Sequence, residues 1–221
     1  MSERQVLVIA AHPDDEVLGC GGTLALHTQR GDKVTILIAR EGESPRYGES
    51  GVGQENHIRA AAKVLGVSDV RPLGLPDQRL DTMTLTDIIT PLEEGVRDVN
   101  PNTVYCQYGG DVNRDHELLF KALLVATRPT EACVAEVLAF DTASSTEWAY
   151  PRSFSPDTWI DISATLSQKL EAMACYKSEL RDYPHPRSLA ELENRAKSWG
   201  NQCCMDAAEV FMTVRRLVRS I

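Results

Sequence analysis

Residues 6–16 read VLVIAAHPDDE and join an apolar segment directly to a group of polar side chains. The segment 6–9 has the length and the β-branched content of a buried strand. His12, Asp14 and Asp15 follow at its carboxyl end, which is the edge where α/β sheets bind their ligands. An imidazole and a carboxylate suit a metal ion, and a second carboxylate beside them suits a general base. The stretch therefore predicts a strand that delivers a metal site to the edge of a sheet.

Strand-like and helix-like patterns alternate along the rest of the chain. The strand-like segments are 6–10, 34–39, 70–72, 103–106 and 134–139, with further candidates at 159–162 and 209–214. Such alternation is typical of α/β proteins whose sheet is mainly parallel. We expect a Rossmann-like three-layer sandwich with a mainly parallel sheet.

Composition limits the classes of protein to which the chain can belong. Its 221 residues, 43% of them hydrophobic, predict one domain spanning residues 1–221. The net charge of −9 argues against binding to nucleic acid or to anionic membranes. No stretch reaches the roughly 18 apolar residues of a membrane span, and no signal-peptide pattern precedes the first strand. We therefore expect a cytoplasmic protein that acts on small molecules. Because no Cys-x-x-Cys pair occurs, a structural zinc ribbon is not expected.

The acidic turn has two other interpretations. Asp14, Asp15 and Glu16 are also favourable at the start of a helix. From composition alone, an acidic helix N-terminus that binds no metal is therefore an alternative. The glycines that follow, at 19, 21 and 22, suggest a dinucleotide-binding loop at first sight. They lack the Gly-x-Gly-x-x-Gly spacing, which argues against that function.

Few histidines are present to complete a metal site: they are His12, His27, His57, His116 and His185. His116 opens the helix-like segment 114–127, soon after the strand at 103–106, so it also falls at the carboxyl edge of the sheet. It shares a helical face with Phe120 and Leu123, and a core histidine is the alternative. His27 and His57 lie on predicted helices without a partner motif, and we expect both to be structural.

The sequence His12-Pro13-Asp14-Asp15-Glu16, followed by the three glycines, resembles the signature of the zinc-dependent N-acetylglucosaminyl de-N-acetylases, the PIG-L or LmbE-like family. Asp115-His116 resembles the end of that family's second motif. The resemblance implies that His12, Asp15 and His116 bind zinc, with ferrous iron as the alternative metal. It also implies that Asp14 is the general base and that Asp115 supports the ligands from behind. The expected products are acetate and a free amino sugar.

The second motif departs from the family at one position. Many members read His-Pro-Asp-His, whereas this chain has Asn113-Arg114-Asp115-His116. Asn113 can donate a hydrogen bond to the substrate but cannot deliver a proton at neutral pH. His185, which is held between Pro184 and Pro186, is our candidate for the missing acid or oxyanion partner, and a histidine in a surface turn is the alternative.

The segment 183–188 resembles the diacetylchitobiose deacetylase subgroup of the family. In that subgroup a C-terminal histidine can come from a neighbouring subunit. The resemblance therefore implies a homo-oligomer in which His185 could act across the interface.

Three further residues are candidates for contacts with the sugar. Arg59 and Asp77 match family positions that contact sugar hydroxyls, and Arg46 lies in a glycine-rich loop over 41–54 where it could bind an anionic aglycone. The alternatives are an exposed helix arginine, a Pro-Asp turn and a solvated loop arginine, respectively.

Together these features predict a metal-dependent hydrolase that removes the acetyl group from an N-acetylglucosamine-type substrate. One alternative is a metal-dependent amidase that acts on a non-sugar amide or a sugar nucleotide. Another is a sugar- or metal-binding protein whose catalysis has decayed. Asp14 argues against the last, because a binding protein does not need a carboxylate that is not itself a ligand beside its metal.

Overall fold

A single mixed sheet forms the centre of the molecule in the computed structural model, which describes residues 3–40, 54–130 and 134–218. Its strands are β1 (Gln5–Ala10), β2 (Lys33–Arg40), β3 (Asp69–Leu75), β4 (Thr103–Gln107), β5 (Glu136–Phe140), β6 (Thr158–Asp161) and β7 (Ala208–Arg216). They are ordered β3-β2-β1-β4-β5-β7-β6, and all neighbouring pairs from β3 to β5 are parallel. β7 pairs antiparallel with both β5 and β6. The predicted α/β fold with a mainly parallel sheet is confirmed.

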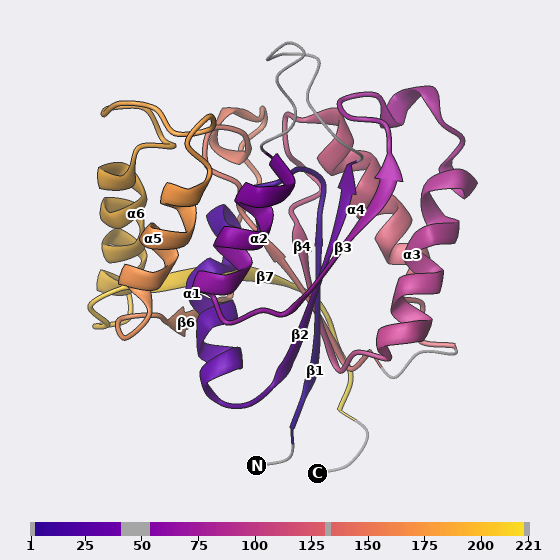
Figure 1. Cartoon of the computed structure of the whole chain (residues 1–221), viewed down its shortest axis with the longest axis horizontal. Helices are drawn as coiled ribbons and strands as arrows, with labels where there is room; N and C mark the ends of the chain where they lie inside the picture. Colours follow the sequence, from indigo (N-terminus) through magenta and orange to yellow (C-terminus); the bar gives the residue numbers. More distant parts are fainter. Residues whose placement is uncertain (1–2, 41–53, 131–133, 219–221) are drawn as a thin grey trace.

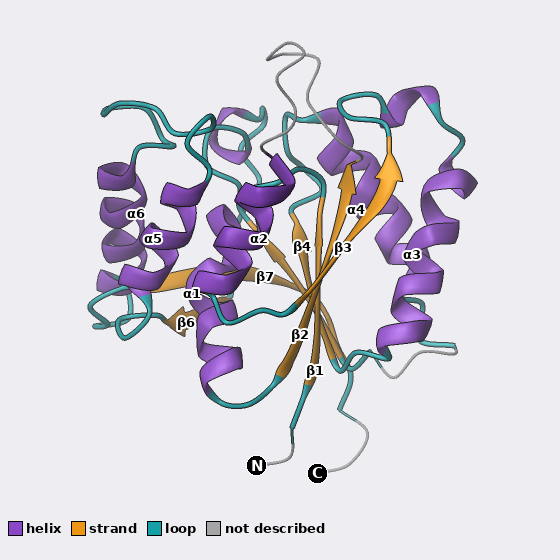
Figure 2. Cartoon of the chain, viewed as in Figure 1, coloured by secondary structure: helices purple, strands orange, loops and turns teal. Residues whose placement is uncertain are grey.

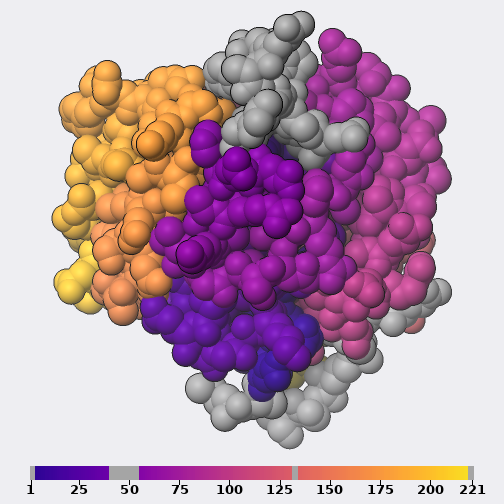
Figure 3. All heavy atoms as spheres, viewed as in Figure 1, coloured from indigo at the N-terminus to yellow at the C-terminus, as the bar shows by residue number. Residues whose placement is uncertain are grey.

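Helices cover both faces of the sheet (Figures 1 and 2). They are α1 (Asp15–Gln29), α2 (Gln54–Val64), α3 (Leu85–Val99), α4 (Arg114–Ala126), α5 (Leu166–Cys175) and α6 (Leu189–Asn201). α3 and α4 form one outer layer, and the other four helices form the second (Figure 1). In the space-filling view the purple atoms of α2 lie against the orange atoms of α5 (Figure 3). None of the helices in the described ranges is long and apolar enough to cross a membrane.

The central strand β1 supplies side chains to both layers. Val6 and Val8 point into the core under α1, α2 and α5, whereas Leu7 and Ile9 point into the core under α3 and α4. All four are completely buried. Burial of one aliphatic side chain contributes about 1.5–3 kcal/mol to the free energy of folding. β1 is therefore a stable strand, and the loop that follows it starts from a fixed position.

The strand order places a topological switch point beside β1. The chain runs outward from β1 to β2 and β3, then returns to place β4 on the other side of β1. The loops that follow β1 and β4 therefore diverge at the carboxyl edge of the sheet, which is where open α/β sheets form their ligand-binding crevice. These loops carry His12 and lead to His116.

The glycines of the opening motif allow α1 to pack closely against the sheet and its neighbours. A Cβ atom on Gly19 would lie 2.0 Å from the buried ring of Phe140 at the end of β5. One on Gly22 would lie 2.9 Å from Ile162. At Gly21 the nearest side-chain atom would be 3.2 Å away. The glycines at 19 and 22 are therefore required by packing.

We expect Gly19→Ala to destabilise the fold by roughly 1–3 kcal/mol or more, because the new methyl group overpacks a closed core. Gly21→Ala is the matched control in the same helix, where a small adjustment and the higher helix propensity of alanine nearly cancel. Urea unfolding of both variants measures the difference. Equal free energies of unfolding would contradict the packing explanation.

Candidate active site

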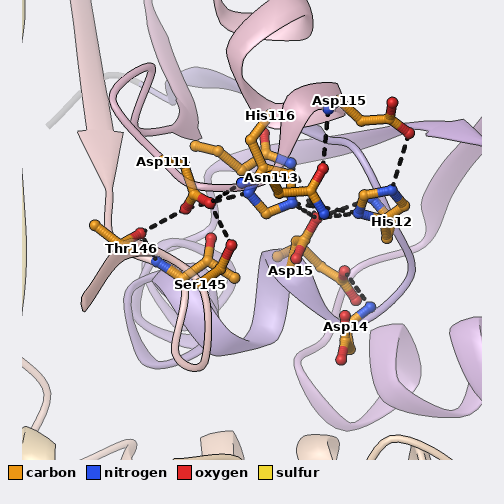
Figure 4. Close-up of polar contacts among 12 residues, drawn as sticks. His12, Asp14, Asp15, Asp111, Asn113, Asp115, His116, Ser145 and Thr146 are labelled. Carbon is orange, nitrogen blue, oxygen red and sulfur yellow. Dashed lines mark hydrogen bonds and ion pairs between the residues drawn. The ribbon is translucent and has the colours of Figure 1, made fainter. Parts of the chain in front are cut away.

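Three polar side chains meet at the carboxyl edge of the sheet. His12 follows β1, Asp15 is the first residue of α1, and His116 lies in the first turn of α4. Nδ1 of His12 and Nε2 of His116 each lie 3.3 Å from Oδ2 of Asp15, and the same two nitrogens lie 3.3 Å from each other (Figure 4). The three atoms therefore form a nearly equilateral triangle, the ligand triangle, from two parts of the chain: His12 and Asp15 share one turn, and His116 lies 104 residues after His12.

This triangle fits a tetrahedrally coordinated metal ion. Nitrogen and oxygen ligands lie about 2.0–2.1 Å from zinc, which places two corners of the tetrahedron about 3.3 Å apart. The second oxygen of Asp15 is buried and has no hydrogen-bond partner among the described residues. Asp14, Asp111 and Asp115 are also buried nearby, each less than a tenth exposed. A divalent cation would offset this concentration of buried negative charge.

A carboxylate lies beside the second ring nitrogen of each imidazole, the one that is not part of the triangle. Oδ2 of Asp111 lies 3.3 Å from Nδ1 of His116, and Oδ2 of Asp115 lies 3.2 Å from Nε2 of His12. Carboxylates in these places fix which ring nitrogen faces the metal and increase its basicity. Asp111 is itself held by Ser145 and Thr146, whose hydroxyl groups donate to it (Figure 4).

These contacts shift the pKa values of His116 and Asp15, two of the candidate ligands, in opposite directions. Burial lowers the pKa of His116, but the neighbouring Asp15 and Asp111 outweigh burial and raise it to about 10. Burial raises the pKa of Asp15, but His116 and His12 outweigh it and hold the pKa well below its usual range. Without a metal the Asp15 carboxylate is therefore ionised and His116 carries a proton, so a cation that binds here takes the place of that proton.

Asp14 lies next to the ligand cluster but is not part of it. Burial raises the pKa of its carboxyl group well above the usual value, while the guanidinium group of Arg187 acts in the opposite direction. Nη1 of Arg187 donates to Oδ2 of Asp14 at 3.0 Å. The main-chain N–H of Asp14 donates to Glu16, whose other oxygen accepts from the hydroxyl group of Tyr176 at 2.6 Å. Asp14 is thus fixed through both its main chain and its side chain.

A cavity of about 460 Å³ opens above the cluster. His12, Asp14 and His116 line it. Trp148, which is 56% exposed, lines it too, and its ring meets that of His185 edge-on at 6.1 Å. The cavity is large enough for a sugar and combines a flat aromatic surface with polar groups, as carbohydrate sites require.

Several predicted substrate residues reach this cavity. Asp77, Asn113 and His185 all line it. Oδ1 of Asp77 lies 3.7 Å from Nε2 of His12. Asn113 caps α4 by accepting a hydrogen bond from the N–H of Asp115 at 2.9 Å, which adds a structural role to the predicted one. His185 comes from the same chain as the ligands, so no neighbouring subunit is needed to bring it to the cavity.

Of the two predicted arginines, only Arg59 is among the described residues, and it does not line the cavity. Arg59 lies on the exposed side of α2, where it is 74% exposed and pairs with Glu55 one turn earlier at 2.6 Å, so the structure does not bring it to the cavity. The i,i+4 spacing of these two residues on an exposed helix face explains the pairing. Arg46 and most of the predicted loop over 41–54 lie outside the described residues.

Several residues of the site were not predicted from the sequence. Asp111 stands in the polar loop before α4, five positions from His116, and that proximity was the only signal for it. Gln107, the last residue of β4, donates to Asp15 at 3.0 Å. Glu179 and Arg187 come from the C-terminal part of the chain, and only the three-dimensional fold brings them to Asp14.

Comparisons with known proteins identify the family to which the sequence is similar. The sequence model of the PIG-L family, described as GlcNAc-PI de-N-acetylase, matches residues 7–127. The deacetylase YaiS of Escherichia coli K12, itself uncharacterised, is 31% identical over 79% of this chain and 91% of its own length. A probable N-acetyl-alpha-D-glucosaminyl L-malate deacetylase 2 of Bacillus cereus is 29% identical over 80% of this chain and 84% of its own.

The fold is also that of a hydratase. The crystal structure of GalB, the 4-carboxy-2-hydroxymuconate hydratase of Pseudomonas putida KT2440, matches with a TM-score of 0.78 at 22% identity, covering 99% of both chains. The fold alone therefore does not determine the reaction. The sequence match is more specific, because residues 7–127 are more than half of the chain and contain every residue of the ligand triangle. The chain belongs to the PIG-L family of GlcNAc-PI de-N-acetylases.

Proposed function

We propose that this protein is a zinc-dependent hydrolase that removes the acetyl group from an N-acetylglucosamine-type substrate. The observation that carries the proposal is the position of Asp14, a buried carboxylate beside three metal-ligand side chains and on the wall of the cavity. A protein that only bound a metal or a sugar would have no use for such a group. The similarity to the deacetylase of Bacillus cereus supports an acetylated glucosamine as the substrate.

His12, Asp15 and His116 would hold the zinc ion. Two imidazoles and one carboxylate leave coordination positions open, as a catalytic site requires. When bound, zinc polarises the amide carbonyl and lowers the pKa of a water molecule towards about 7. Ferrous iron would suit the same two-histidine, one-carboxylate set and is the alternative metal.

Asp14 would take the proton of the attacking water. Its carboxylate is adjacent in sequence to the ligand Asp15 and faces the same cavity, which places it within reach of a water molecule beside the metal. A positioned base of this kind contributes about 10²–10⁴-fold to the rate.

His185 and Asn113 would act on the substrate itself. His185 lines the cavity, and its Nδ1 accepts a hydrogen bond from the N–H of Arg187 at 3.1 Å, so Nε2 is the nitrogen that can donate. Burial and the neighbouring Arg187 and Arg181 lower the pKa of His185, so the imidazole, once it has been protonated, would give up that proton readily to a departing amine. The amide nitrogen of Asn113 would donate to the acetamide oxygen. Asp77 would accept from sugar hydroxyls.

The test is the release of acetate by the zinc-loaded protein. Suitable substrates are N-acetylglucosamine, diacetylchitobiose, UDP-N-acetylglucosamine and N-acetylglucosaminyl malate, with Asp14→Asn as the control. Release that disappears in the variant supports the proposal and ranks the aglycones. If none of the four releases acetate while zinc is bound and the fold is intact, the proposal is wrong.

His185→Gln is expected to lower kcat by roughly 10²-fold or more while KM stays close to the wild-type value, because glutamine can donate a hydrogen bond but cannot deliver a proton. Steady-state kinetics on the best of these substrates measures both constants. A rise in KM alone would show that His185 only contacts the sugar.

Mixing of subunits tests whether the site is shared. His185 already lines the cavity of its own chain, so we expect oligomers that combine Asp14→Asn and His185→Gln subunits to recover no activity. Recovery would instead establish that the histidine acts across an interface.

A further inference from the structure

The side chain of Arg187 donates hydrogen bonds to three residues that are far apart in the sequence. Its Nη1 donates to Oδ2 of Asp14 and to Oε2 of Glu179, both at 3.0 Å, and its Nε donates to the hydroxyl oxygen of Ser144 at 2.7 Å. Asp14 and Glu179 are both less than a tenth exposed. A planar guanidinium group with fixed donor directions suits such a junction, because each bond restrains the other two.

Asp14 stands at the N-cap position of α1 without capping the helix, and its main chain has an uncommon conformation. Asp14 precedes the first residue of α1, but its side chain makes no capping hydrogen bond, and its φ of 102° is unusual for a residue other than glycine. Such a conformation costs about 1–3 kcal/mol and persists where surrounding contacts enforce it. Glu16 holds the main-chain N–H of Asp14, and Arg187 holds the carboxylate.

The same residue also contacts the proposed acid. The main-chain N–H of Arg187 donates to Nδ1 of His185 at 3.1 Å. Neutral His185 then carries its proton on Nε2. The side chain of Arg187 therefore holds the proposed base, and its main chain holds the ring of His185 in one orientation.

We propose that Arg187 is a positioning residue that couples Asp14 and His185 into one catalytic unit. The inference rests on the proposed function. Arg187 donates a hydrogen bond to Oδ2 of Asp14. The other carboxylate oxygen, Oδ1, is then the one that takes the proton of the attacking water molecule. Arg187 and His185 lie beyond residues 7–127, so the C-terminal part of the chain completes a site whose ligands come from the part that matches the family.

Arg187→Ala should lower kcat by roughly 10²-fold, the cost of a small displacement of a catalytic group, while KM changes little. Millimolar guanidinium should restore at least a tenth of the wild-type kcat by occupying the vacated place. Arg187→Lys should be intermediate, because a single ammonium group cannot reproduce the fork that joins Asp14, Glu179 and Ser144.

Arg195→Ala is the matched control. The side chain of Arg195 is 27% exposed, against 23% for Arg187, and it also binds a buried carboxylate, that of Asp141. Arg195 is not among the residues that line the cavity. Any activity lost through reduced stability in this variant should not return with guanidinium.

Crystal structures of the zinc-loaded wild type and of Arg187→Ala provide a readout that is independent of turnover. We expect the carboxylate of Asp14 to turn away in the variant while His12, Asp15 and His116 keep their places. An unmoved Asp14, a loss confined to KM, or an absence of guanidinium rescue in a folded, zinc-loaded variant would each overturn the inference. If the wild type releases no acetate at all, the proposed function fails, and the position of Asp14 in the two structures still tests the role of Arg187.

Discussion

Asp14→Asn is expected to keep its metal and its fold and to lose about 10²–10⁴-fold in kcat. Asparagine has nearly the same shape as aspartate, and its carbonyl oxygen can still accept the hydrogen bond from Arg187. What it cannot do is take a proton from water. Because Asp14 is not one of the three ligand side chains, zinc should remain bound.

Asp15→Asn is the sharpest control for that variant, since it makes the same chemical change one residue later. Oδ2 of Asp15 faces both ligand imidazoles at 3.3 Å, so this substitution should release the metal. Zinc content by plasma emission spectroscopy and acetate release, measured on both variants, separate the two roles. Full activity in Asp14→Asn would remove the general-base assignment, and loss of zinc from it would make Asp14 a ligand.

The residues of the site that follow directly after a strand could be predicted from the sequence. His12 and Asp15 follow a buried strand within a few residues, and His116 opens a helix after another strand. Because ligand sites of α/β sheets form at the carboxyl ends of strands, these positions predict one shared edge of the sheet, and the resemblance to the family implies that all three side chains are ligands. The ligand triangle agrees with that prediction. Strand positions were likewise predictable, because β-branched apolar segments are a local signal.

The contacts that depend on tertiary structure could not be predicted in this way. No local pattern places β7 between β5 and β6 and antiparallel to both, because pairing partners are chosen by packing across the whole sheet. Arg187 reaches Asp14 across 173 positions in the chain. Arg59 is the converse case: it matches a family position, and on α2 it pairs with Glu55 at the surface, so its predicted contact with the sugar stays a prediction.

His116→Ala should remove metal binding almost completely, whereas Asp111→Asn should weaken it by about 10–100-fold. The first substitution deletes one corner of the triangle, with its 3.3 Å contacts to His12 and Asp15. The second keeps all three ligands but weakens the acceptor that faces Nδ1 of His116 at 3.3 Å. The difference in metal affinity between the two variants distinguishes a ligand from the residue that orients it.

Thermal unfolding with and without zinc measures this difference without an activity assay. A metal that binds only the folded protein stabilises it by about 2.7 kcal/mol at a free concentration of 100 times Kd. At one fixed zinc concentration the wild type should therefore show the largest increase in Tm, Asp111→Asn a smaller one, and His116→Ala none. An increase in His116→Ala equal to that of the wild type would mean that the metal binds elsewhere. His116 is buried against Asp111. In His116→Ala the carboxylate of Asp111 loses the imidazole, and it also loses the cation whose binding it supports. The Tm of this variant without zinc therefore also tests whether the core tolerates an unpaired carboxylate.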